Sequence, residues 1–205
     1  MEIKPEELVA NNYTLLASLE HHNIIPFVRT YIKKKTRFAT IYYISNIIPL
    51  LLLFFFSYKY YNTPGFTIIN CINHFCYGLA IAIALVPLHE YIHVLAYKSQ
   101  GAKQTSYDSN IKKFYFMAIA DQFVANRKEF QIVALAPFVC ISSVLIVLLF
   151  FAAPSWNYTI IGILFTHTAC CSGDFTLLSF FDFHKDKTVV TYDDKKNKIS
   201  YFFEK

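Results

Sequence analysis

Four long apolar stretches constrain the fold of this chain more than any other feature of the sequence. They occupy residues 38–56, 66–97, 130–153 and 158–181. About 20 apolar residues in a helix cross the hydrocarbon core of a bilayer. Only 16% of the 205 residues are charged, whereas a soluble domain has about 25%. The sequence therefore predicts an all-α polytopic membrane protein with about four transmembrane helices.

The basic residues indicate which loops face the cytoplasm. Lysine and arginine cluster before the first stretch, between the second and third, and after the fourth, whereas the other two loops contain only Lys59. Cytoplasmic loops carry such an excess of basic residues. We therefore expect both termini to be cytoplasmic. The predicted regions are a cytoplasmic N-terminal segment (1–37), a four-span membrane domain that contains a metal site (38–183) and a cytoplasmic C-terminal tail (184–205).

The net charge of +5 does not point to a nucleic-acid partner. The basic residues flank apolar stretches and form no stripe of their own. The bilayer lipids are the expected surroundings instead, and no nucleic-acid partner is expected.

Small β elements are expected outside the spans. The β-prone residues 114–120 are too short to cross a membrane and predict a small hairpin or re-entrant element. Residues 188–192 and 199–203 flank a polar turn and predict a β-hairpin in the C-terminal tail. Leucines at roughly helical spacing predict a partly helical N-terminal segment, with Pro26 ending that pattern.

The second apolar stretch ends in a metal-binding pattern, His89-Glu90-Tyr91-Ile92-His93. Residues four apart share a face of a helix, so His89 and His93 can bind one Zn²⁺ while Glu90 reaches a water on that metal. Composition alone gives roughly 0.008 chance matches to HExxH in a chain like this. The alternative is a pair of helix-end histidines beside a solvated glutamate.

The position of this pattern follows from the length of the stretch. The 32 residues of 66–97 would extend about 48 Å as one helix, which exceeds a core of about 30 Å. Pro87 provides a natural break just before His89. We therefore expect HExxH at the inner edge of the membrane.

Two histidines leave a catalytic zinc one protein ligand short. Asp174 lies inside the fourth stretch, where a carboxylate costs about 2.5–3.5 kcal/mol, so it is expected to be functional or paired to a neighbouring helix. Glu129 is a weaker candidate ligand. His167 lies deeper on the same face as Asp174 and is expected to support the site through a hydrogen bond. Asp108 is expected to be solvated.

All five cysteines lie in apolar stretches, and no CxxC occurs. Buried free thiols are therefore expected. The adjacent Cys170 and Cys171 have poor geometry for one tetrahedral metal.

The order of several short motifs resembles a known family. The motifs are Leu88 to His93, Gly101, Ala136-Pro137 and Ser172-Gly173-Asp174. Together they resemble a family of small bacterial membrane proteins described as zincin peptidases and, more distantly, the site-two intramembrane metalloproteases. The resemblance covers about residues 66–183.

The resemblance implies specific roles for four residues. In the site-two class, two histidine ligands and a glutamate lie on one membrane helix and an aspartate ligand lies on a later one. Carried over, the metal ligands are His89, His93 and Asp174, and Glu90 is the catalytic residue. The Asn-Pro and Leu-Asp-Gly signature of that class is absent around Asp174. The resemblance also implies a bacterial cell membrane.

The sequence thus favours a membrane-embedded zinc metallopeptidase that hydrolyses peptide bonds near the cytoplasmic membrane face. Its partner would be a protein or peptide substrate, which could itself be membrane-bound. One alternative is a non-catalytic accessory or immunity-type membrane protein with a structural or vestigial HExxH site. Another is a transporter that uses Asp174 and His167 as a relay.

Overall fold

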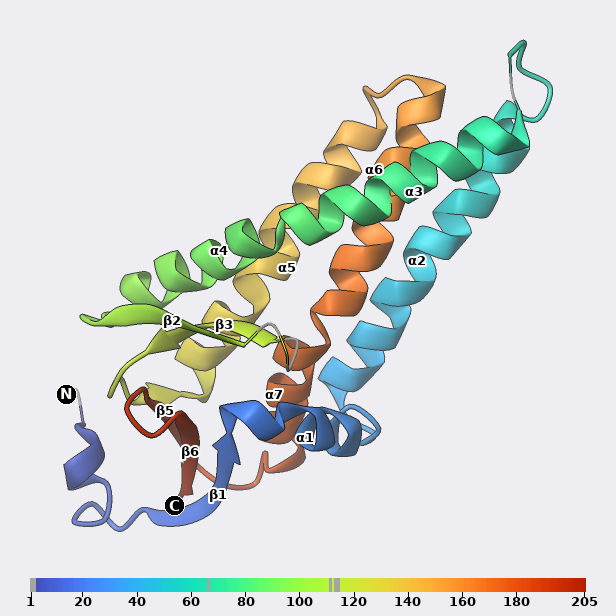
Figure 1. Cartoon of the computed structure of the whole chain (residues 1–205). Coiled ribbons are helices and arrows are strands. Elements are labelled where there is room, and N and C mark those ends of the chain that lie inside the picture. The colour runs from blue at the N-terminus through green and yellow to red at the C-terminus, as the bar shows by residue number, and fades with distance from the viewer. Residues whose placement is uncertain (1–2, 66, 111, 113–114) are drawn as a thin grey trace. The chain divides into compact units, whose positions relative to one another are not determined.

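The computed structural model describes residues 3–65, 67–110, 112 and 115–205, and it contains helices and sheets (Figure 1). The α-helices are α1 (Ile24–Tyr31), α2 (Arg37–Tyr60), α3 (Ile68–Ala84), α4 (Val86–Ser99), α5 (Arg127–Leu149), α6 (Pro154–Cys170) and α7 (Ser172–Phe183). The strands are β1 (Thr14–Glu20), β2 (Thr105–Asn110), β3 (Tyr115–Ala120), β4 (Ala125–Asn126), β5 (Val189–Asp194) and β6 (Ile199–Glu204).

The prediction of an all-α protein is wrong. The described strands form a four-stranded antiparallel sheet in the order β1-β6-β5-β4 and a separate two-stranded sheet of β2 and β3. The β5–β6 hairpin and the strand at 115–120 were predicted, and Phe114 lies outside the described residues. The β5–β6 hairpin belongs to a larger sheet with β1 and β4, which the sequence did not indicate.

The predicted helix in the N-terminal segment is also wrong where β1 forms. Strand β1 pairs with β6 from Thr14 opposite Glu204 to Glu20 opposite Ile199. The leucine spacing suits a helix locally, but the edge of β6 provides partners for the β1 backbone, and tertiary context overrides such weak preferences. Pro26 does not end the helical structure, because it lies in the first turn of α1, where proline is tolerated.

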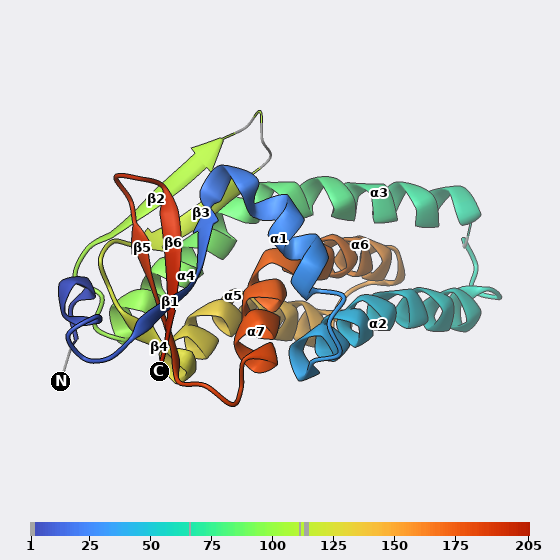
Figure 2. The same cartoon turned by 90° about the horizontal axis from the view of Figure 1, so that it is seen from below.

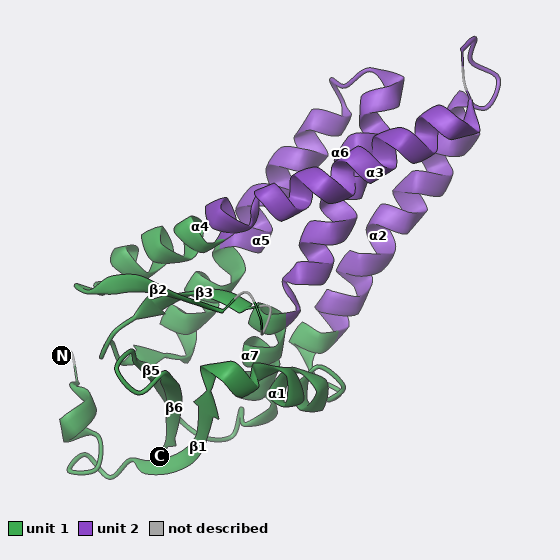
Figure 3. Ribbon diagram, viewed as in Figure 1, with its two compact units in different colours: residues 1–39, 90–136, 173–205 green, residues 40–89, 137–172 purple. Residues whose placement is uncertain are grey.

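The chain divides into two compact units (Figure 3). Unit 1 comprises residues 1–39, 90–136 and 173–205. It contains both sheets, and β1, β6 and β5 are seen side by side in Figure 2. An aromatic cluster connects α7 to its neighbours: the Phe180 ring centroid lies 4.9 Å from that of Tyr31 and 4.6 Å from that of Phe202. Phe180 and Phe202 are buried, so they form part of the core of this unit.

Unit 2 comprises residues 40–89 and 137–172. Its helices α3 and α6 run side by side (Figures 1 and 2). They approach so closely that a Cβ atom added to Gly78 would lie 2.8 Å from the Cα atom of Gly162. Small residues allow membrane helices to pack backbone against backbone in this way.

Two to four segments of the described chain are long and apolar enough to cross a membrane. Helices α2 and α5 qualify alone, whereas α3 with α4 and α6 with α7 qualify only as pairs, bent by 44° and 43°. Exposed aromatic side chains such as Phe54 and Phe150 fit a lipid-facing surface. Two of the four predicted spans are therefore broken helices. The first break, between Ala84 and Val86, lies next to the predicted one at Pro87.

Asp108 is buried, contrary to the expectation that it is solvated. Its Oδ2 lies 3.1 Å from Nδ1 of the buried His21, and its Oδ1 accepts a hydrogen bond from Lys198 Nζ at 2.7 Å. The His21 ring reaches Ser200 Oγ through Nε2 at 3.3 Å. This polar cluster connects the β2–β3 hairpin to the four-stranded sheet within unit 1.

Asp108→Asn is expected to destabilise unit 1 at neutral pH and to have little effect in acid. Burial raises the pKa of Asp108, but hydrogen bonds and charges from Lys198 and His21 outweigh burial and leave the pKa below its ordinary value of 3.8. The folded state therefore prefers the ionised carboxylate. That stabilisation is present above pH 3.8 and is lost as the pH falls through the lowered pKa.

The measurement is thermal unfolding in detergent across this pH range. The gap in Tm between wild type and Asp108→Asn should narrow as the pH is lowered. Asp186→Asn, on the exposed tail, is the matched control and should unfold like the wild type. A gap that stays constant down to strong acid would contradict the assignment.

Candidate metal centre

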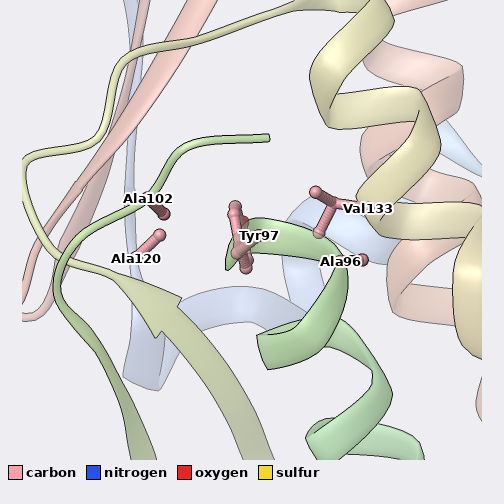
Figure 4. Packing of buried hydrophobic residues seen from close by; sticks show 5 residues of the cluster. All are labelled: Ala96, Tyr97, Ala102, Ala120 and Val133. Atoms are coloured by element: carbon pink, nitrogen blue, oxygen red, sulfur yellow. The ribbon is translucent and has the colours of Figure 1, made fainter. Parts of the chain in front are cut away.

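Helix α4 carries the HExxH pattern, and its C-terminal half is anchored in the core of unit 1. Pro87 lies in the first turn of α4, where its missing N–H is tolerated. Farther along the helix, Ala96 and Tyr97 are buried with Val133 of α5 and with Ala120 of β3 (Figure 4). The chain then leaves the helix at Gly101, whose φ of 102° suits glycine.

His89, Glu90 and His93 are all buried on this helix. One ligand atom from each lies within 4.8 Å of the other two. This follows from helix geometry, because His89 and His93 lie one turn apart on one face. Burial of three ionisable groups in an apolar helix is costly unless they are paired or bind a metal.

The His93 ring is oriented by a hydrogen bond that suits a metal ligand. Its Nδ1 lies 3.0 Å from the carbonyl oxygen of Val133. A carbonyl can only accept, so Nδ1 carries the proton and donates it. In the neutral ring, Nε2 then carries the lone pair. Metal-binding histidines generally have such a partner on the second ring nitrogen.

Asp174 lies beside this second nitrogen, in the first turn of α7. The distance from His93 Nε2 to Asp174 Oδ1 is 3.2 Å. A tetrahedral zinc ion separates a nitrogen ligand from an oxygen ligand by about 3.4 Å. The pair therefore fits one zinc ion, and the same distance also suits a direct ion pair between the two side chains.

Glu90 is oriented by the backbone of β3. Its Oε2 accepts a hydrogen bond from the N–H of Ala118 at 2.7 Å. The N–H groups of a strand point alternately to its two edges. Strand β3 pairs with β2 along one edge, and the Ala118 N–H points to the opposite edge, toward Glu90. The contact fixes the carboxylate relative to the strand. Ala118 could not be identified from the sequence, because any residue can supply a backbone N–H.

The two remaining candidates have different positions. His167 lies beside His89 in unit 2, with 3.3 Å between His167 Nε2 and His89 Nδ1. Glu129 caps the start of α5: its Oε2 accepts from the Asn126 N–H at 2.8 Å, while Asn126 Oδ1 accepts from the Glu129 N–H at 3.1 Å. This reciprocal cap gives Glu129 a structural role in unit 1.

A buried HExxH helix with an aspartate against one of its histidines has the features of the zinc-dependent hydrolase class. Residues 82–188, more than half of the chain, match a protein family described as "putative zincin peptidase". The chain belongs to this family. No curated protein and no solved structure matches the chain in the corresponding comparisons. The matched segment contains both the HExxH pattern and Asp174.

Proposed function

We propose that this protein is a membrane-embedded zinc metallopeptidase that hydrolyses peptide bonds near the cytoplasmic face of a bacterial cell membrane. The family assignment supports the metallopeptidase class, and the two to four apolar helical segments support the membrane location. The observation that carries the proposal is the 3.2 Å contact between His93 and Asp174. It pairs the HExxH pattern with a third candidate ligand from a distant part of the sequence.

In this proposal, His89, His93 and Asp174 bind the zinc ion. His89 and His93 contribute from one face of α4, and Asp174 contributes from the start of α7. Three protein ligands with one open position are typical of catalytic zinc sites. The distant resemblance of the sequence motifs to site-two metalloproteases would imply the same set, since that class uses two histidines and an aspartate.

The residues of the chain then have separate roles in hydrolysis. When bound, zinc supplies a Lewis acid and an acidified water. The Glu90 carboxylate accepts a proton from the attacking water and returns it to the nitrogen of the leaving amine. The Ala118 N–H keeps this carboxylate oriented, and the Val133 carbonyl keeps the His93 ring oriented.

The expected substrate is a protein or peptide with an extended segment, and membrane-bound proteins are among the expected substrates. Among the described residues, strand β3 pairs with β2 in a two-stranded sheet, and it contacts Glu90 through Ala118. An extended substrate that adds to such a strand would place its backbone near the catalytic carboxylate.

The test is a metal count on the purified protein in detergent. We expect the wild type to bind zinc, and we expect His93→Ala and Asp174→Ala each to bind one equivalent less. Asp186→Ala is the matched control for the loss of a carboxylate and should retain the zinc, because Asp186 lies on the exposed tail. A folded wild type that binds no zinc would overturn the proposal.

A further inference from the structure

We propose that His89, His167 and Cys171 form a second cation site, which contains sulfur and lies entirely within unit 2. All three side chains are buried, and one ligand atom from each lies within 4.8 Å of the other two. His89 comes from α4, His167 from α6, and Cys171 from the break between α6 and α7. The site would take a thiophilic cation such as Zn²⁺.

The separations between the ligand atoms are close to those around one metal ion. His89 Nδ1 and His167 Nε2 are 3.3 Å apart, and a tetrahedral zinc ion separates two ring nitrogens by about 3.3 Å. His167 Nε2 and Cys171 Sγ are 3.9 Å apart, against about 3.6 Å between nitrogen and sulfur ligands of one zinc. A shift of a few tenths of an ångström in the thiol would complete the match.

The local backbone explains why these ligands converge. His167 and Cys171 are four residues apart and share a helical turn, with the Cys171 N–H donating to the His167 carbonyl at 3.1 Å. His89 lies one turn after the break between α3 and α4, where its N–H donates to the Leu85 carbonyl at 2.9 Å. Broken membrane helices commonly line ion and substrate sites.

The ligand chemistry distinguishes this site from the one assigned to peptide hydrolysis. A thiolate with two imidazoles prefers soft cations, whereas the HExxH group with Asp174 has no sulfur. His89 belongs to both groups, but an imidazole ring has two nitrogens on different sides. Its Nδ1 faces His167, and in this proposal its Nε2 binds the other metal. A ring that binds both cations is an imidazolate, which has lost the single N–H proton of the neutral ring.

Cobalt provides a readout that only a sulfur ligand can produce. The metal-free protein in detergent is titrated with Co²⁺ alone, so that no zinc competes for the sulfur site. We expect a near-ultraviolet sulfur-to-cobalt charge-transfer band in the wild type. The band should be absent in Cys171→Ser and in His167→Ala. Cys170→Ser is the matched control, because the neighbouring Cys170 is exposed, and it should keep the band.

Failure of this site can be distinguished from failure of the proposed peptidase, on which it rests only through the shared His89. Asp174→Ala and His93→Ala should lose the first zinc and keep the cobalt band. A folded wild type without the band would overturn the second site, whatever the zinc count. A band that survives in folded Cys171→Ser but disappears in Cys170→Ser would overturn it as well.

Discussion

Glu90→Gln is expected to slow peptide-bond hydrolysis by about 10²–10⁴-fold, the usual contribution of a general acid–base group, while the zinc stays bound. The glutamine amide cannot accept the proton of the attacking water, and so it cannot return one to the leaving amine. Its carbonyl oxygen can still accept the hydrogen bond from the Ala118 N–H, which Glu90 accepts at 2.7 Å in the structure. The variant should therefore fold normally.

The measurement needs no knowledge of the natural substrate. The purified protein in liposomes is incubated with a pool of unstructured peptides in water enriched in oxygen-18, and new carboxyl termini that carry the heavy isotope are counted by mass spectrometry. Glu129→Gln is the control, because Glu129 caps α5, and it should keep wild-type activity. If Glu90→Gln keeps full activity and zinc, the catalytic role is wrong. If the folded, zinc-bound wild type forms no labelled termini, a non-catalytic accessory or immunity-type protein becomes the better explanation.

The side chains of the candidate metal site could be predicted from the sequence. The backbone groups that orient these side chains could not. His89, Glu90 and His93 follow from spacing on one helix, and Asp174 is conspicuous as a carboxylate within an apolar stretch. The contacts that orient these groups come from the backbone of Ala118 and Val133. A backbone N–H or carbonyl has the same chemistry in every residue type, so only the tertiary fold shows which one is used.

The fold was predictable to the extent that hydropathy determines it. The apolar stretches correspond to helices, and Pro87 indicated the first break. The break at Cys171 had no proline to indicate it. Strand β1 was missed because its leucines fit a helical period, and Asp108 was misjudged because its partners His21 and Lys198 are far away in the sequence.

Gly78→Ala and Gly162→Ala are expected to be the most damaging small substitutions in unit 2. A Cβ atom at Gly78 would clash with the backbone oxygen of Thr159, and one at Gly162 would clash with the backbone oxygen of Phe75. Neither clash can be relieved by turning a side chain, so α3 and α6 must move apart. Overpacking of a well-packed core costs about 1–3 kcal/mol and occasionally more, out of a total stability of about 5–15 kcal/mol.

Unfolding by SDS in mixed detergent micelles measures this loss. Each variant should unfold at a lower SDS fraction than the wild type. Gly173→Ala is the matched control: it makes the same change in the first turn of α7, where an added Cβ atom would meet nothing within 4 Å. It should be neutral or slightly stabilising, because alanine favours a helix over glycine by about 1 kcal/mol. Equal unfolding of Gly78→Ala and Gly173→Ala would show that α3 and α6 do not pack through these glycines.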